Sequence, residues 1–140
     1  MISIRPAVAT DIETLCSMDL VAQTDTERRE LIAASVTAKT CYVAVSNGEV
    51  IGYGVLTYSF YRQGWIDLVY VTERYRRLGA GKALLDHIER QCRTAKLFTS
   101  TNLSNFQMQA LLGKLGYTVS GVINNLDDSD LEIVYFKRLS

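Results

Sequence analysis

Apolar and polar positions along the chain predict an alternation of strands and helices. Short runs rich in β-branched and aromatic residues predict strands at ISIR, CYVAV, EVIGYGVLTYSF, GWIDLVYV, KLFTS, YTVSGVI and DLEIVYFKRL. Helices are expected over TDIETLCSMDL, from Asp25 to about Lys39, from about Gly79 to Arg93, and from Ser104-Asn105 to about Leu115. The order β-α-α-β-β-β-α-β-α-β-β predicts a mixed α/β domain with one central sheet.

Cap and turn residues mark the boundaries of these elements. Thr10 with Glu13 three residues later has the spacing of a capping box, and Asn47-Gly48 is the strongest short hairpin signal. Ser104-Asn105 is expected to cap the last helix, and Gly116 to stop it. The acidic segment 124–130, NNLDDSD, predicts a solvated turn between the last two strands.

Composition narrows the classes of protein that this chain can be. Its 140 residues fit one domain, and Lys+Arg and Asp+Glu are both 15, so the formal net charge is zero. Without a basic excess, bulk binding to nucleic acid or to an anionic membrane is not expected, although a local basic patch is still allowed. The cysteines Cys16, Cys41 and Cys92 are far apart and His87 is the only histidine, so neither a metal site nor a disulfide framework is expected. A start without an apolar signal segment, and the absence of a long apolar run, predict a cytoplasmic protein.

The segment RRLGAGKALL, between the strand ending LVYV and the following helix, has the character of a phosphate loop. The first amides of a helix lack partners inside the helix and lie at the positive end of its dipole, so they favour an anion. A P-loop would need a glycine where Arg76 stands and a hydroxyl where Ala83 stands, and a dinucleotide loop would need a glycine at Leu84. The remaining pattern is Arg76-x-x-Gly79-x-Gly81.

This pattern, in this context, resembles the acetyl-CoA loop of the GCN5-related N-acetyltransferase (GNAT) family. The likeness extends to SNFQMQALLGKLGY, where Asn105, Lys114, Gly116 and Tyr117 are in register with a family segment, and it covers essentially the whole chain. It implies a single GNAT-like domain over residues 1–140, with a mixed, mostly antiparallel sheet flanked by helices. It also implies direct transfer of an acetyl group from acetyl-CoA to a primary amine, with CoA as product.

The resemblance also implies how acetyl-CoA is held. The backbone amides of residues 77–82 would cradle the pyrophosphate, and Arg76, Arg77 or Lys82 could add charged contacts. The backbone of residues 69–71 would pair with the pantetheine arm, and Asn105 would bond the arm from the other side or act as a plain helix cap. The residues expected to contact the cofactor are therefore Val69, Tyr70, Val71, Arg76, Arg77, Leu78, Gly79, Ala80, Gly81, Lys82 and Asn105.

The proposed transfer also needs a base that accepts the amine proton and an acid that protonates the leaving sulfur. Asp67 interrupts an apolar strand and shares a face with Trp65, so it is a candidate base whose apolar neighbours would raise its pKa; the alternative is a solvated or ion-paired carboxylate. Many family members carry a proton-donating tyrosine seven residues after the Asn105 position, where this chain has Leu112. Tyr70 and Tyr117 are candidate substitutes, although Tyr117 is also expected as a core residue.

Several functional readings therefore stay open. The acceptor would be a small-molecule or peptide amine, with no metal and no nucleic-acid or membrane partner, and a homodimer is an open alternative. The missing tyrosine allows a second function: an acyl-CoA-binding sensor or partner module with the same fold and little catalysis. A nucleotide-phosphate binder is a third alternative.

Overall fold

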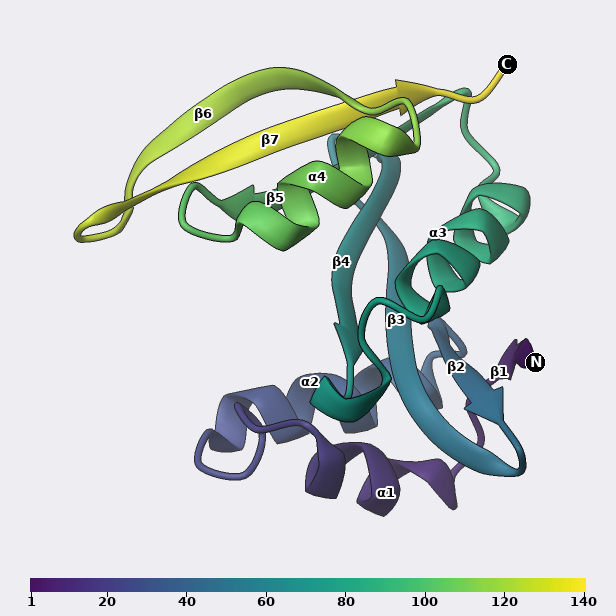
Figure 1. Ribbon diagram of the computed structural model, residues 1–140. Helices are drawn as coiled ribbons and strands as arrows, with labels where there is room; N and C mark the ends of the chain where they lie inside the picture. The colour runs from purple at the N-terminus through teal and green to yellow at the C-terminus, as the bar shows by residue number, and fades with distance from the viewer. The chain divides into compact units, whose positions relative to one another are not determined.

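The structure, a computed structural model that describes residues 1–140, confirms the predicted order of strands and helices. Figure 1 shows its elements, which are β1 (Ile2–Pro6), α1 (Asp11–Met18), α2 (Thr26–Thr37), β2 (Cys41–Ser46), β3 (Glu49–Phe60), β4 (Gln63–Val71), the 3-10 turn η1 (Glu73–Tyr75), α3 (Ala80–Gln91), β5 (Lys96–Asn102), α4 (Phe106–Lys114), β6 (Thr118–Asp127) and β7 (Asp130–Arg138).

The strands form one seven-stranded sheet in the order β1-β2-β3-β4-β5-β7-β6. The pair β4–β5 is parallel, whereas β1–β2, β2–β3, β5–β7 and β6–β7 are antiparallel, so the predicted mixed, mostly antiparallel sheet is confirmed. The chain divides into two compact units. Unit 1 comprises residues 1–56 and 68–90, and unit 2 comprises residues 57–67 and 91–140.

The core of unit 1 joins the first two helices to the strands that follow them. Leu15, Ile32, Val43 and Tyr53 are fully buried in one cluster. A second cluster contains Ala44, Ile51, Ala80 and Leu84 and packs α3 against the sheet. The β2–β3 hairpin turns at Asn47 and Gly48, whose φ values of 51° and 78° are those of the predicted tight turn.

The start of α1 differs from the prediction. Thr10 has helical φ and makes no side-chain cap, so the predicted capping box is wrong. Instead, Asp11 Oδ2 accepts a hydrogen bond from the Val8 amide at 2.8 Å, and Arg5 bonds both oxygens of the same carboxylate. This pairing with Arg5 holds the pKa of Asp11 below its usual value.

In unit 2, α4 begins and ends where the sequence predicts. Asn105 Oδ1 accepts a hydrogen bond from the Met108 amide at 3.1 Å, and Gly116 has a φ of 92° just after the helix. The predicted turn at 124–130 is shorter than expected, because β6 continues to Asp127. One contact that favours this extension is Asn102 Nδ2 to Asp127 Oδ2, at 2.7 Å.

Candidate donor-binding site

The last residues of β4 are fixed from both faces of the strand. Val69 and Val71 pack against the cluster that contains Ala80 of α3, whereas Tyr70 packs against the cluster that includes Leu15 of α1. The next residue is also held, since the Thr72 amide bonds the Ile51 carbonyl at 2.9 Å. The backbone expected to pair with pantetheine is therefore a rigid part of unit 1.

Between β4 and α3, the chain makes a 3-10 turn and an exposed loop. Arg77 and Gly79 adopt positive φ values of 66° and 94°. Residues 76–79 are exposed, whereas the next residue, Ala80, is 1% exposed. Gly79 is therefore the point where the loop turns sharply into the helix, in a conformation that favours glycine.

The N-terminus of α3 offers free amides in a positive field. Ala83 makes the first bond within the helix, from its amide to the Gly79 carbonyl at 2.9 Å. The amides of Ala80, Gly81 and Lys82 precede that bond, and the first turn has no acidic residue. This arrangement suits an anion such as a pyrophosphate.

Two of the expected cationic side chains already have partners in the protein. Arg76 Nε donates to the Val71 carbonyl at 2.8 Å, and its guanidinium carbon lies 5.4 Å from the centre of the Tyr70 ring. Lys82 Nζ lies 2.7 Å from Asp86 Oδ2, in a salt bridge that is largely exposed. The role of each in binding a phosphate stays a prediction.

A buried polar network in unit 1 was missed by the sequence reasoning. Asp19 is fully buried and accepts hydrogen bonds from Arg28 Nε at 2.9 Å and from the Tyr53 hydroxyl at 2.5 Å. The amides of Val21 and Ala22 bond its other oxygen. Burial raises the pKa of Tyr53 far above its usual value, so Tyr53 is a neutral donor to Asp19.

This network adjoins Tyr70. The Leu20 amide, next to Asp19, donates to the Tyr70 hydroxyl at 3.1 Å, so the turn after α1 is tied to β4. No sequence motif predicts these contacts, because the residues that make them lie up to 50 positions apart in the chain.

Asp67 lies in a different setting from the one predicted. It shares a strand face with Trp65, as expected, and the Trp65 indole donates to Asp67 Oδ1 at 3.3 Å. However, Asp67 is exposed rather than surrounded by apolar side chains. Alternation along β4 places it on the face opposite to Tyr70. Its role as the base stays a prediction.

The remaining candidates pack as structural residues. Leu112, at the position where the family often has tyrosine, is 1% exposed, and Tyr117 is 3% exposed. His87 packs edge-on against Tyr42 at 4.8 Å, and burial lowers the pKa of His87. None of the helices is long and apolar enough to cross a membrane.

Comparisons with known proteins give the family of this chain. Residues 9–117 match the model of the Acetyltransferase (GNAT) family, and no match was found among curated proteins. A GNAT-family acetyltransferase from Bacillus cereus has 27% identity and a TM-score of 0.92, with 99% of this chain and 97% of that chain covered.

Two further solved structures share the fold. The ribosomal-protein-S18-alanine N-acetyltransferase of Escherichia coli has 19% identity and a TM-score of 0.83, with 100% and 95% of the two chains covered. Arabidopsis thaliana Naa50, in complex with the bisubstrate analogue CoA-Ac-MVNAL, has 17% identity and a TM-score of 0.78, with 97% of each chain covered. With the family model matched over most of its length, this chain belongs to the GNAT acetyltransferase family, whose acyl donor is acetyl-CoA.

Proposed function

We propose that this protein is an N-acetyltransferase that moves the acetyl group of acetyl-CoA directly to a primary amine. The observation that carries the proposal is the anion-accepting start of α3, entered through Gly79 at positive φ and placed directly after the rigid end of β4. Family membership supports this reading of the loop.

The loop would supply the donor contacts. Backbone amides of residues 77–82 would bind the pyrophosphate, and the backbone of Val69, Tyr70 and Val71 would pair with the pantetheine arm and polarise the thioester carbonyl. Arg76 could join the phosphate contacts only after it releases the Val71 carbonyl, its present partner. The contact of Asn105 with the pantetheine arm stays a prediction, and its side chain now caps α4.

The transfer itself needs one proton acceptor and one proton donor. The amine nitrogen attacks the thioester carbonyl, so an N–C bond forms and the C–S bond breaks. The amine proton would pass to Asp67, directly or through water, and the CoA sulfur would take up a proton as it leaves. Leu112 cannot supply that proton. The Tyr70 hydroxyl accepts from Leu20 and so keeps its own proton to donate, which makes it the better placed of the two candidate tyrosines.

The acceptor amine is the second substrate of the proposed transfer. The names of two fold relatives refer to the alanine of a ribosomal protein and to a peptide, so peptide amines are the first class to test. The β6–β7 hairpin carries Asp127, Asp128 and Asp130, whose charge would attract a cationic amine.

Calorimetry with acetyl-CoA and with CoA tests donor binding, and thiol release across a panel of amines tests transfer. We expect binding in the micromolar range or tighter, and Gly81→Asp should weaken it strongly because it adds bulk and negative charge at the anion site. Gly113→Asp is the matched control, since it adds the same charge at another helical position, one where a Cβ would meet open space. Absence of binding at high micromolar concentration, or equal affinity of both variants, would place the pyrophosphate elsewhere.

A second candidate function is an acyl-CoA-binding module without efficient catalysis. The buried Leu112, at the position of the family tyrosine, favours it. This candidate predicts tight CoA binding without thiol release for any amine in the panel, and rapid release with one amine excludes it.

A further inference from the structure

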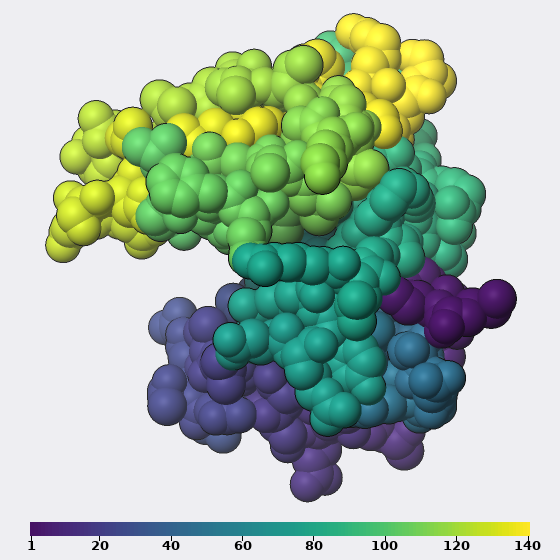
Figure 2. Space-filling view, viewed as in Figure 1, coloured from purple at the N-terminus to yellow at the C-terminus, as the bar shows by residue number.

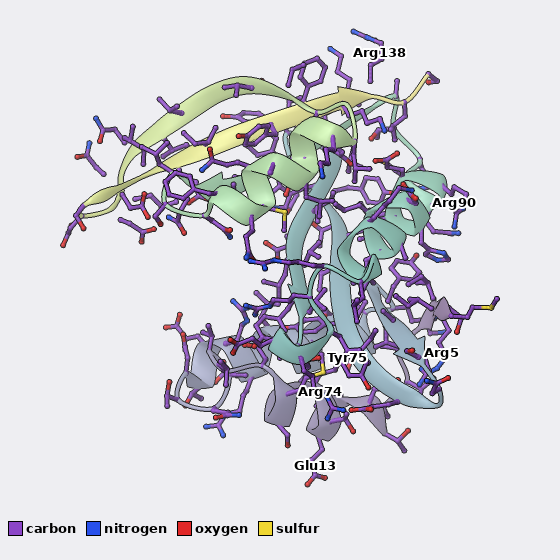
Figure 3. The ribbon with its side chains drawn as sticks, viewed as in Figure 1. Arg5, Glu13, Arg74, Tyr75, Arg90 and Arg138 are labelled. Atoms are coloured by element: carbon purple, nitrogen blue, oxygen red, sulfur yellow. The ribbon has the colours of Figure 1, made fainter.

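Charge is segregated along unit 2, although the whole chain is neutral. Four of its five carboxylates gather near the β6–β7 hairpin, at Asp127, Asp128, Asp130 and Glu132, and the fifth, Asp67, accepts a hydrogen bond from the Trp65 indole. At the opposite end of β7, Arg138 is paired with Lys96 of β5; together with Arg62 of the β3–β4 turn and Arg93, which precedes β5, they form what we call the basic end. Figure 2 shows the yellow C-terminal end of the chain on the surface at the upper right, and Figure 3 labels Arg138 there, at the end of β7 away from the hairpin.

Two cations of the basic end face each other. Lys96 and Arg138 are direct cross-strand partners in the β5–β7 pair. Like charges in this position repel and destabilise a sheet unless an anion lies between them. The ion pairs Arg5–Asp11, Arg28–Asp19 and Lys82–Asp86 include neither of these two cations.

A row of aromatic rings lies on the same face of the sheet. Phe98 and Phe136 are partners two residues inward from Lys96 and Arg138, with ring centres 5.7 Å apart. Trp65 is the β4 partner of Phe98, and Phe60 stacks on Trp65 at 4.6 Å and contacts Phe98 at 5.1 Å. These four half-buried rings, Phe60, Trp65, Phe98 and Phe136, form an aromatic ladder that leads to the basic end.

The β3–β4 turn adds an aromatic ring and a cation at the cost of backbone strain. Tyr61 and Arg62 both have positive φ, 54° and 64°, which non-glycine residues rarely adopt in succession. The β2–β3 hairpin, in unit 1, uses Asn47-Gly48 for the same kind of turn. Tyr61 is 82% exposed and contacts Phe60 edge-on, so the strained turn presents its side chains to solvent rather than to a core.

We propose that this face of unit 2 binds a single-stranded nucleic acid, with phosphates on the basic end and bases stacked on Tyr61 and the aromatic ladder. Cations that follow a backbone, combined with aromatic rings on an open sheet face, are the two elements of sequence-tolerant single-strand recognition. An acidic protein segment would use the cations but would give no reason for an exposed tyrosine in a strained turn. The neutral composition argues only against binding by the chain as a whole, because four of the five carboxylates of unit 2 lie at the hairpin end; the fifth, Asp67, is next to Trp65 and would lie away from the phosphates on the basic end.

Fluorescence anisotropy with a labelled 12-nucleotide RNA, and with DNA of the same sequence, tests the proposal on the full chain. At low salt we expect micromolar binding, with a slope of log K against log salt of about −3 for four phosphate contacts. Lys96→Glu with Arg138→Glu should abolish binding. Arg29→Glu with Lys39→Glu makes the same charge change at exposed positions of unit 1 and should retain most of the affinity. Preference for RNA or DNA identifies the natural strand.

The β3–β4 turn allows a sharper test, because stability and binding should change in opposite directions. Tyr61→Asn with Arg62→Gly installs the favoured turn, so the melting temperature should rise while the affinity for the strand falls about tenfold or more. Proper folding of each variant is checked by its binding of acetyl-CoA. The proposal is overturned if wild type does not bind either strand, if the turn variant binds as tightly as wild type, or if polyglutamate competes as well as the oligonucleotide.

Discussion

Replacement of Gly79 by alanine isolates the role of backbone conformation in the donor loop. The φ of Gly79 is 94°, beyond the usual left-handed region, and a Cβ at this position would meet no atom within 4 Å. No steric clash therefore contributes, and the whole penalty comes from the backbone. For an L-residue in a left-handed conformation this penalty is about 1–2 kcal/mol.

The penalty must appear in one of two measurements. If the loop of the variant keeps its conformation, the free energy of unfolding falls by about 1–2 kcal/mol and acetyl-CoA affinity is unchanged. If the loop relaxes, stability is largely spared, but the donor must restore the conformation, and affinity falls about 5- to 30-fold. The loss in free energy of unfolding, measured in urea, and the loss in free energy of acetyl-CoA binding, measured by calorimetry, should together amount to about 1–2 kcal/mol.

Gly113→Ala is the matched control, because the same methyl group is added where the backbone is helical. Gly113 lies within α4, and its Cβ would also meet open space. Here alanine should raise stability by up to about 1 kcal/mol. Gly79→Ala should therefore lose free energy of unfolding or of binding, whereas Gly113→Ala should gain free energy of unfolding. A combined loss near zero for Gly79→Ala would show that the loop does not need this glycine, and the reasoning about its conformation would fail.

Three further predictions concern groups whose partners the structure defines. Tyr53→Phe removes a hydrogen bond to the buried Asp19 carboxylate and should lower the free energy of unfolding by about 1.5–3 kcal/mol in urea. The pKa of Asp11 is lower in the folded protein than in the unfolded chain. The ionised carboxylate therefore stabilises the fold fully above about pH 4, and this contribution is lost as the pH falls through the folded pKa. Arg5→Ala should remove this acid dependence of the urea midpoint. The pKa of His87 is lowered in the folded protein, so as the pH falls the imidazole of the unfolded chain is protonated first. The free energy of unfolding should therefore decline below about pH 6.5, and His87→Gln should flatten this part of its pH dependence.

Features set by a few neighbouring residues could be predicted from the sequence. The Asn47-Gly48 turn, the Asn105 cap and the Gly116 stop all occur where expected, because each depends on local φ preferences and short side-chain reach. The Thr10 cap failed although its local signal was equally good. Asp11, supported by Arg5 from β1, binds the amide of Val8 and fixes the approach to the helix instead.

The buried network could not be predicted, since its members meet only after folding. Asp19 lies 34 residues before Tyr53, and a charged residue after a helix is usually solvated. The same limit applied to charge: a formal sum of zero gives no information on where the charges lie. Only the strand register shows that Lys96 is opposite Arg138.

The donor loop can attract a phosphate through its cations and through its backbone amides. The sequence offered three cations, but Arg76 is bonded to Val71 and Lys82 to Asp86, which leaves Arg77 as the cation with no partner in the protein. The backbone amides at the start of α3 need no such release, because the helix leaves them without partners by its geometry. We therefore infer that the amides and the helix dipole provide the first attraction for a pyrophosphate, and that Arg76 and Lys82 join only after they exchange their present partners.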